Sequence, residues 1–480
     1  MSDDAEVTIR AHWKSFVACG VMALSPFQYG LDFGIIGGFQ AMPGFLQIYG
    51  HPAPETVLGW NISTTRQQLI SSLMTLGAFT TTGLAGIIAI KLGRRVSMWL
   101  SCLLCIVANV IMMTTTHIGA LYVGRLVIGL ANGGLIIFSQ LYIQEVSPAK
   151  YRALFFNAFQ FCVSLGTLIG TIIDWATAKR PDRSAYLIPL SVVFVIPVVL
   201  IIGIFFIPES PRWLIERGQS DKGRKSLDWL RPTSVEADQE ATDIQRAIEL
   251  ERDTKDGISV LDMFKNPIDR RRTILSICVV SLQNVPGSMF IIPYKAYFLA
   301  IAKVSDPFAM SNVLSAIGLL GLIVGASLVV RYGRRRVLLI GGLLGCGTLQ
   351  LAMAVTYDKH GGTPEAGKAI VALCSVFMFV YVGAIGPYSY LIGGELPSQR
   401  LRTYTFGLSS SIGFLLTWCI TFTAPYFINP NSLGWGPKYG YIWFPSAMIG
   451  ALWTFLFLPE LKGRTLEEID EMVFPPPSRS

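Results

Sequence analysis

The chain has 480 residues, of which 52% are hydrophobic and only 15% are charged. Soluble domains carry about 25% charged residues, and many apolar runs here reach the ~20 residues that cross a bilayer. These numbers exclude a soluble protein. The net charge of +8 does not call for a nucleic-acid partner, because the basic residues gather in loops between apolar runs.

The apolar runs predict twelve membrane-spanning helices in two groups of six. The first run is too long for a cleavable signal peptide, so we interpret it as a span. The expected spans are 14–38, 66–90, 96–115, 119–144, 153–176, 186–207, 272–301, 309–330, 336–356, 367–393, 403–428 and 440–458. We therefore expect an all-α membrane protein with an N-terminal six-helix half (1–207), a cytoplasmic helical linker (208–271), a C-terminal six-helix half (272–458) and a cytoplasmic tail (459–480).

Basic loops orient these spans. Loops at 91–95, 150–152, 331–336 and 400–402 are rich in Lys and Arg, and each follows an even-numbered span. Cytoplasmic loops carry this excess, so both termini are expected in the cytoplasm, although Lys179, Arg180 and Arg183 fall on the opposite side. The sequon at Asn61 then lies outside, and its use is left open.

Motifs of the first half recur in the second. Lys91-Leu92-Gly93-Arg94-Arg95 recurs as Arg331-Tyr332-Gly333-Arg334-Arg335, and Pro208-Glu209 recurs as Pro459-Glu460. Duplicated membrane halves around a central site are the plan of a secondary transporter. The repeated charges either only set topology or form ion pairs across the two halves that close the inner side. The expected inner gate comprises Arg94, Arg95, Glu145, Arg152, Glu209, Arg212, Arg334, Arg335, Glu395 and Arg402.

Few ionisable residues fall inside the spans, and each is a functional candidate. Asp32 in the first span and Arg125 in the fourth are expected to form the proton-coupling site, since a carboxylate near a guanidinium ionises and one without it is protonated. The alternative is a permanent structural pair in a facilitator. Asp174 lies at the outer end of the fifth span, where we expect water to reach it. Lys295 either snorkels to the outer interface or attracts an anionic solute from a vestibule.

The seventh span is broken by Pro286, Gly287 and Pro293. Irregular backbone at membrane depth is tolerated where it lines a cavity. Amide and aromatic side chains near these breaks suit a neutral polyhydroxyl ligand, although a single amide more often joins helices. The expected substrate-binding residues are Gln160, Gln283, Asn284, Tyr294, Tyr388 and Tyr390.

Together these motifs resemble the sugar porter family of the major facilitator superfamily over nearly the whole chain. The specific ones are the two Gly-Arg-Arg repeats, Gly124-Arg125, the Pro208-to-Leu214 run and the Pro459-to-Glu467 run. The segment from Ala424 to Trp443 looks closest to fungal permeases of the maltose/α-glucoside type. The resemblance implies the major facilitator fold, proton coupling through Asp32 and Arg125, and sugar contacts at Gln160 and Gln283.

This chain departs from the family pattern at several positions. Ile90 and Val330 replace acidic residues before the Gly-Arg-Arg motifs, while Met289 and Gly318 replace polar sugar ligands. Tyr390 stands at the tryptophan position of the tenth span, as in the α-glucoside group. The site is therefore expected to be larger and less polar than a glucose site.

We interpret the chain as a fungal plasma-membrane importer that couples protons to a sugar or sugar-like solute and acts as a monomer in the lipid bilayer. Alternatives are a permease for a secondary metabolite or organic acid, a sugar facilitator, or a nutrient sensor, which the short tail disfavours. The sequence contains no nucleophile–base set or metal-ligand spacing, so an enzyme, a metal and a cofactor are not expected.

Overall fold

The computed structural model describes residues 11–54, 59–148, 151–255, 262–302, 304, 306–361, 363–397 and 401–460. Two parts of the sequence-based prediction lie outside the described residues. They are the tail motif after Glu460 and the side chains of the expected gate residues Arg152 and Arg402.

The first half consists of six spans. They are α1 (Trp13–Phe39), α3 (Thr64–Leu92), α4 (Arg94–Thr114), α5 (Ile118–Val146), α6 (Arg152–Thr177), and α7 (Ser184–Val192) with α8 (Val195–Phe206). The sixth span divides at Val193, where Pro197 lacks an N–H and its ring clashes with the carbonyl four residues earlier. A short helix α2 (Pro43–Tyr49) and an antiparallel pair, β1 (His51–Pro52) and β2 (Trp60–Asn61), follow α1.

The second half repeats this plan. It contains α13 (Pro267–Ser281), α14 (Ser288–Ile291), η2 (Ile292–Tyr294), α15 (Lys295–Ile301), α16 (Pro307–Tyr332), α17 (Arg335–His360), α18 (Pro364–Val380), η3 (Tyr381–Ile385), α19 (Gly386–Glu395), α20 (Arg402–Ile428), η4 (Gly436–Tyr439) and α21 (Gly440–Phe457). The tenth span is continuous from α18 to α19 through η3, which is a π-helical turn. Between the halves lie α9 (Pro211–Glu216), α10 (Ser220–Leu230), α11 (Ser234–Lys255) and α12 (Asp262–Lys265).

The expected twelve-span fold is confirmed. Among the described residues, ten helices are long and apolar enough to cross a membrane. The first and seventh positions are filled by α1 and by the discontinuous α13–α15. Span limits match the apolar runs closely; for example, the run 309–330 corresponds to α16 at Pro307–Tyr332.

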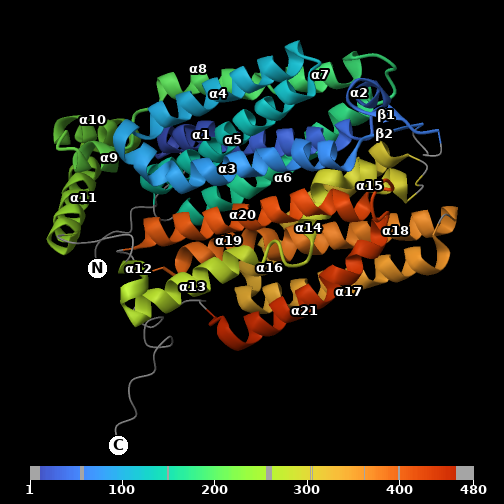
Figure 1. Cartoon of the computed structure of the whole chain (residues 1–480). Coiled ribbons are helices and arrows are strands. Elements are labelled where there is room, and N and C mark those ends of the chain that lie inside the picture. The colour runs from blue at the N-terminus through green and yellow to red at the C-terminus, as the bar shows by residue number, and fades with distance from the viewer. Residues whose placement is uncertain are drawn as a thin grey trace, which may run out of the picture.

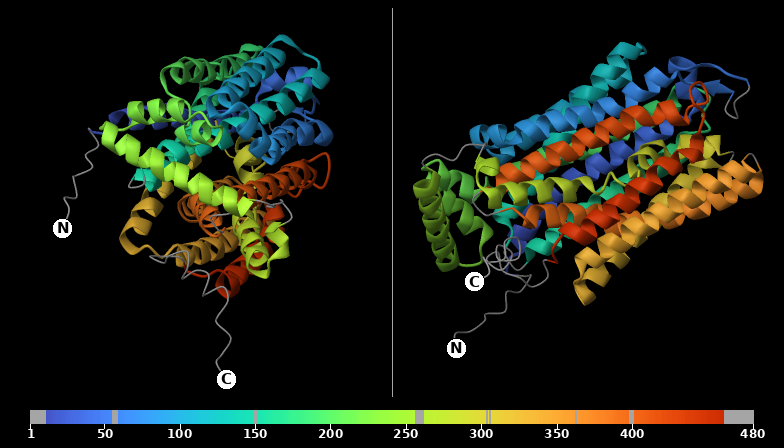
Figure 2. Two further views of the ribbon diagram at one scale, coloured as in Figure 1. Left: turned by 90° about the vertical axis from the view of Figure 1, so that its left-hand side faces the viewer. Right: turned by 60° about the horizontal axis from the view of Figure 1, so that its bottom comes forward.

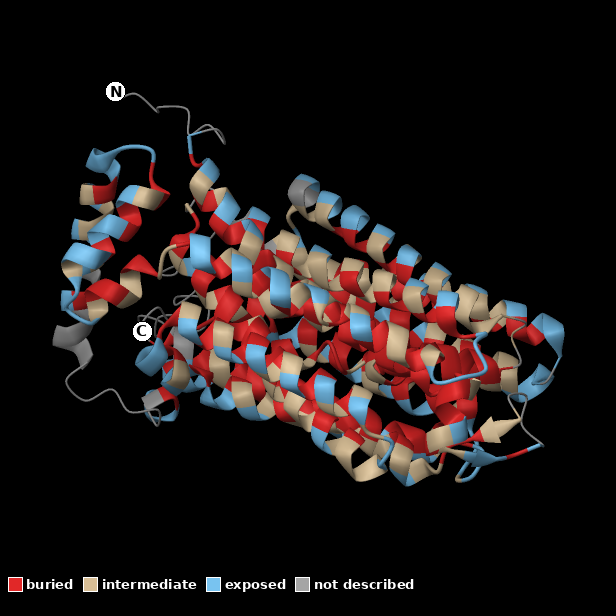
Figure 3. Cartoon of the chain, turned by 90° about the horizontal axis from the view of Figure 1, so that it is seen from above, coloured by how far each residue is buried: buried red, intermediate tan, exposed pale blue. Residues whose placement is uncertain are grey.

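The spans of the two halves lie side by side along one axis (Figure 1). Helices α9–α11 lie at one end, which we call the linker end, and β1 and β2 lie at the other, the hairpin end (Figures 1 and 2). Buried residues gather inside the bundle and exposed ones on its outer faces (Figure 3). Large apolar side chains such as Phe206, which is 75% exposed, are on the outside, whereas Arg125 is buried. Soluble proteins show the opposite arrangement, so apolar side chains outside and a charged one inside fit a molecule surrounded by lipid.

Glycines allow the spans to approach each other closely. A Cβ on Gly30 of α1 would stand 2.0 Å from the Val163 carbonyl oxygen of α6, and one on Gly166 would stand 2.2 Å from the Phe27 carbonyl oxygen. Because lipid gives no hydrophobic drive for helix association, such backbone contacts carry much of the packing. The α1–α6 interface therefore depends on close backbone packing, which one added methyl group would disrupt.

We predict that Gly30→Ala destabilises the protein, because the added Cβ overpacks a backbone contact at a cost of about 1–3 kcal/mol. The matched control is Gly20→Ala on the same helix, where a Cβ would meet nothing within 4 Å. Thermal unfolding in detergent should show a lower Tm for Gly30→Ala and an unchanged or slightly higher Tm for Gly20→Ala. Equal Tm values would contradict the close-contact argument.

Candidate functional site

A cavity of about 170 Å³ lies between the two halves. Spans α1, α5 and α6 line it from the first half, and the broken seventh span, α16, α18, η3, α19 and α20 line it from the second. The polar lining residues are Tyr29, Gln140, Gln160, Ser164, Thr167, Gln283, Ser315, Tyr381, Tyr390 and Thr417. The two halves thus share one cavity, to which each contributes polar side chains.

The broken seventh span brings Gln283 to this cavity. Helix α13 ends at Ser281, and Gly287 adopts the left-handed conformation with φ 73° before α14 begins. A Cβ on Gly287 would meet the Trp443 ring at 2.4 Å, so glycine is required there for both backbone and space. The structure brings Gln283, Gln160 and Tyr390 together in the lining, as the sequence predicts.

Three other predicted substrate residues lie outside the cavity lining. The Asn284 amide donates to the Gly413 carbonyl over 3.1 Å and accepts from Thr417 over 2.9 Å. Tyr294 donates its hydroxyl to the Thr421 carbonyl over 2.7 Å, and Tyr388 packs in the core of the second half. Asn284 and Tyr294 thus bond to α20, and Tyr388 is part of the core. They are therefore not among the solute contacts that we propose below.

Sequence reasoning missed several lining residues. Gln140 of α5 contributes a third amide, and Tyr29 and Phe33 of α1 contribute aromatic faces on either side of Asp32. The signal for Gln140 was a polar residue inside an apolar span. Met289 and Gly318 also line the cavity, so the replacements noted in the sequence fall within the site.

Asp32 and Arg125 form a buried ion pair inside the first half. Arg125 Nη1 lies 3.2 and 3.3 Å from the two Asp32 carboxylate oxygens, and the Asn132 amide donates to Asp32 Oδ2 over 3.4 Å. Arg125 Nε also donates to the Ile70 carbonyl over 3.0 Å. Asp32 is only 2% exposed, so removing either partner would leave a buried charge at a cost of about 3–5 kcal/mol. The pair joins α1, α3 and α5 directly behind the cavity wall.

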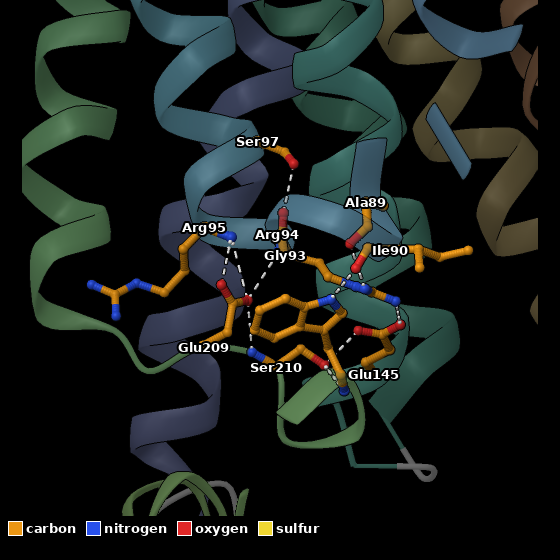
Figure 4. A network of polar contacts seen from close by, with 10 residues as sticks. Ala89, Ile90, Gly93, Arg94, Arg95, Ser97, Glu145, Glu209 and Ser210 are labelled. Carbon is orange, nitrogen blue, oxygen red and sulfur yellow. Dashed lines mark hydrogen bonds and ion pairs between the residues drawn. The ribbon is translucent and has the colours of Figure 1, made fainter. Parts of the chain in front are cut away.

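At the linker end, the repeated motif of the first half forms a dense polar network (Figure 4). Arg94 Nη2 lies 2.6 Å from Glu145 Oε1, and Ser210 donates to Glu145 Oε2 over 2.5 Å. The Glu209 carboxylate accepts the backbone N–H groups of Arg94 and Arg95, so it caps the N-terminus of α4. Burial raises the pKa of the Glu209 carboxyl above its usual range, and these backbone donors oppose the shift.

The expectation that these charges pair across the two halves is wrong for the ion pairs that the structure describes. Arg94–Glu145 lies within the first half, and Arg335–Glu395, at 2.5 Å, lies within the second. Glutamate and arginine of one repeat are brought together by neighbouring helices of the same half. Of the other expected gate residues, Arg334 is exposed, Arg95 binds the Ile204 carbonyl at the end of α8, and Arg212 is half-buried on α9.

Several hydrogen bonds that join the two halves lie instead at the hairpin end. The Asn429 amide donates to the Gln67 side chain over 2.8 Å and to the Ile62 carbonyl over 3.0 Å. Tyr297 donates to Asn61 Oδ1 over 3.2 Å, and the hydroxyls of Thr64 and Ser432 are 2.6 Å apart. These bonds close the hairpin end. They also leave Asn61 2% exposed, so its sequon is inaccessible in this conformation.

Two expectations about ionisable residues are also wrong. Lys295 does not snorkel to water: its side chain is 2% exposed, and its Nζ donates to Ser315 Oγ over 2.6 Å. Asp174 does not meet bulk water either, because it is 1% exposed. Neither residue is part of the cavity lining. Both are enclosed because the halves meet on either side of them.

Comparisons with known proteins agree with this fold. A family model described as "Sugar (and other) transporter" matches residues 18–473. The low-affinity glucose transporter HXT3 of Saccharomyces cerevisiae is 26% identical over 472 residues, covering 95% of this chain and 81% of that protein. The high-affinity glucose transporter ght2 of Schizosaccharomyces pombe is 27% identical, with 94% and 86% covered. The major facilitator-type transporter ecdD of Aspergillus rugulosus is 25% identical, with 97% and 88% covered.

Solved structures show the same architecture. The xylose transporter XylE from E. coli, in a partially occluded inward open conformation, superposes with a TM-score of 0.77 at 18% identity, covering 95% of this chain and all of that one. The proton:xylose symporter XylE bound to 6-bromo-6-deoxy-D-glucose gives 0.75 at 19% identity, with 96% and 99% covered. The chain belongs to the sugar (and other) transporter family of the major facilitator superfamily.

Proposed function

We propose that the protein is an alternating-access symporter that couples protons to a neutral sugar or sugar-like solute. The observation that carries this proposal is the cavity between the halves, with Gln140 and Gln160 on one side and Gln283 on the other. Amides from both halves would bind hydroxyl groups of one solute, so its occupancy would favour closure of the halves around it. The glucose and xylose transporters among the similar proteins support the same solute class.

The size and charge of the cavity favour a small neutral solute. Its volume of about 170 Å³ is below the ~300–1,000 Å³ of sites for drug-sized ligands. None of the described residues that line it is ionised at neutral pH. An anionic solute would need a cation in the lining, and Lys295 points to Ser315 instead. Neutral sugars are therefore favoured over organic acids.

The linker end is proposed to face the cytoplasm of a fungal cell, with the transporter in the plasma membrane. Lys91, Arg94, Arg95 and the cluster Arg334–Arg336 all lie at this end, which agrees with the excess of basic residues in cytoplasmic loops. Both termini would then be cytoplasmic, and the closed hairpin end would be extracellular.

Asp32 is the proposed proton-coupling site. Its carboxylate is buried against Arg125, one helix face away from Tyr29 and Phe33 of the cavity wall. A shift of α1 on solute binding would change the distance between carboxylate and guanidinium, and the carboxylate would then gain or lose a proton. The facilitator alternative requires the pair to remain ionised throughout the cycle.

A second candidate is a permease for a less polar sugar conjugate or secondary metabolite. Met289, Gly318, Phe159 and Phe414 give the cavity a largely apolar wall, which a glucose molecule would use poorly. The α-glucoside resemblance points the same way, toward a solute other than a plain hexose. Uptake of labelled mono-, di- and trisaccharides and a glycoside panel by transporter-null yeast separates these possibilities. Uptake of none of these solutes, with the protein at the cell surface, would count against both.

We predict that Gln283→Ala and Gln160→Ala each raise the half-saturation concentration roughly tenfold, the ~1.4 kcal/mol of one hydrogen bond lost in a desolvated site. Gln245→Ala, on the linker helix α11, is the matched control and should leave it unchanged. The measurement is initial uptake rate against solute concentration at equal surface expression. Unchanged half-saturation in both cavity variants would remove these amides from the site.

We predict that Asp32→Asn abolishes accumulation of solute driven by a pH gradient but preserves exchange of labelled for unlabelled solute. The amide keeps the size of the carboxyl group but does not bind and release a proton. Proteoliposomes with an imposed pH gradient measure the first activity, and counterflow measures the second. Asp358→Asn, which removes a carboxylate from a surface ion pair, is the control. Gradient-driven accumulation by the Asp32 variant would exclude Asp32 as the coupling residue.

A further inference from the structure

A second pair of ionisable residues is buried where the two halves meet, on the hairpin side of the cavity. Asp174 comes from α6 of the first half, and Lys295 is the first residue of α15 in the second. Both line one small void of about 10 Å³, together with Gly34, Gly37 and Gly38 of α1. A void of this size has room for a single water molecule. The two residues of opposite charge therefore line the same void, one from each half.

A hydrogen bond to Ser315 fixes the Lys295 side chain. Its ammonium donates to Ser315 Oγ over 2.6 Å, and the Thr171 hydroxyl of the first half lies 3.5 Å from the same oxygen. Ser315 also lines the solute cavity. A chain of contacts thus runs from the cavity through Ser315 to Lys295.

Asp174 has no side-chain hydrogen-bond partner among the described residues, and only the backbone of Gly38 on the same half acts on its carboxylate as a donor. Both carboxylate oxygens are buried, and Oδ2 stands 2.0 Å from where a Cβ on Gly38 would lie. The charged group that acts on Asp174 is Lys295, and the reverse is also true. The other residues around the void, from α1, α6, α15 and α16, carry no charge. Each ion therefore depends on the other half for its compensating charge.

A buried charge without its partner has a large free-energy cost, whereas the same charge in water does not. Closing the hairpin end encloses Asp174 and Lys295 together, and parting the halves exposes both to water. We propose that Asp174 and Lys295 form an outer gate, a charge pair across the two halves that holds the hairpin end closed and separates each time that end opens. This inference rests on the proposed transport function, and it adds a gate distinct from the Asp32–Arg125 pair.

The gate predicts opposite effects of single and double neutralisation. Asp174→Asn or Lys295→Met leaves one uncompensated charge in the closed state, so the hairpin end should open more often. Asp174→Asn combined with Lys295→Met leaves no charge to bury, so closure should return. Lys295→Arg keeps the positive charge, so the hairpin end should stay closed as often as in the parent protein. Removing the exposed Asp358–Lys438 ion pair of the second half is the matched control.

A cysteine at Thr75 reports opening independently of transport. The Thr75 and Thr421 hydroxyls lie 3.4 Å apart across the two halves, and Thr75 is 1% exposed. The full-length chain with Thr75→Cys is labelled in intact cells by a membrane-impermeant maleimide, and labelling of the chain without this substitution is subtracted. We expect the single variants to label on the order of tenfold faster than the parent, and the double variant within about twofold of it.

Two results would overturn the gate. One is single variants that are labelled at the parental rate; the other is a double variant whose increase in labelling rate equals the product of the two single increases. If the single variants misfold, the double variant should still fold, and it should be labelled as slowly as the parent. A double variant that misfolds or is labelled fast also overturns the proposed gate. Because labelling needs no solute, a failed uptake panel with this labelling pattern would reject the proposed solute class and leave the gate in place.

Discussion

Polar groups inside a membrane bundle have to find their partners within the bundle, and the placement of those partners organises this protein. At the linker end, the described ion pairs of the repeated motifs, Arg94–Glu145 and Arg335–Glu395, each lie within one half. At the hairpin end, hydrogen bonds of Asn429 and Tyr297 cross from half to half. Bonds within a half make it a rigid body, and bonds between halves are those that a moving transporter has to break.

The glycine contacts reinforce this division. Close backbone approach through Gly30 and Gly166 locks α1 to α6, and Gly129 of α5 would bring a Cβ within 2.1 Å of the Met74 carbonyl of α3. These interfaces are tightly packed and internal to the first half. The cavity lies where such packing is absent and where polar side chains from both halves meet. Rigid halves around an adaptable centre are what alternating access needs.

Much of the fold was predictable, because span limits follow from apolar runs and the seventh span breaks near its prolines, whereas the division of the sixth span at Val193 was not expected. The Asp32–Arg125 pair was also predictable, since few charges lie in the spans and they have to meet. Duplication of Glu145 and Glu395 could not show whether each glutamate pairs within its own half or across the interface. A linear span likewise does not say which side chains face a neighbour, so the burial of Lys295 and the rotation of Asn284 away from the cavity were missed.

The π-helical turn at Tyr381–Ile385 has a consequence for the second half of the site. Such a turn contains one residue more than an α-helical turn, and it is retained where it sets the direction of side chains. Tyr381 and Val382 of this turn line the cavity, and Tyr390 follows on α19. Deleting a single residue here would relax the segment to regular α-helix and rotate everything after it by about 100°. The tenth span thus owes its inward-facing tyrosine to one surplus residue, so the site is sensitive to the length of this helix as well as to its composition.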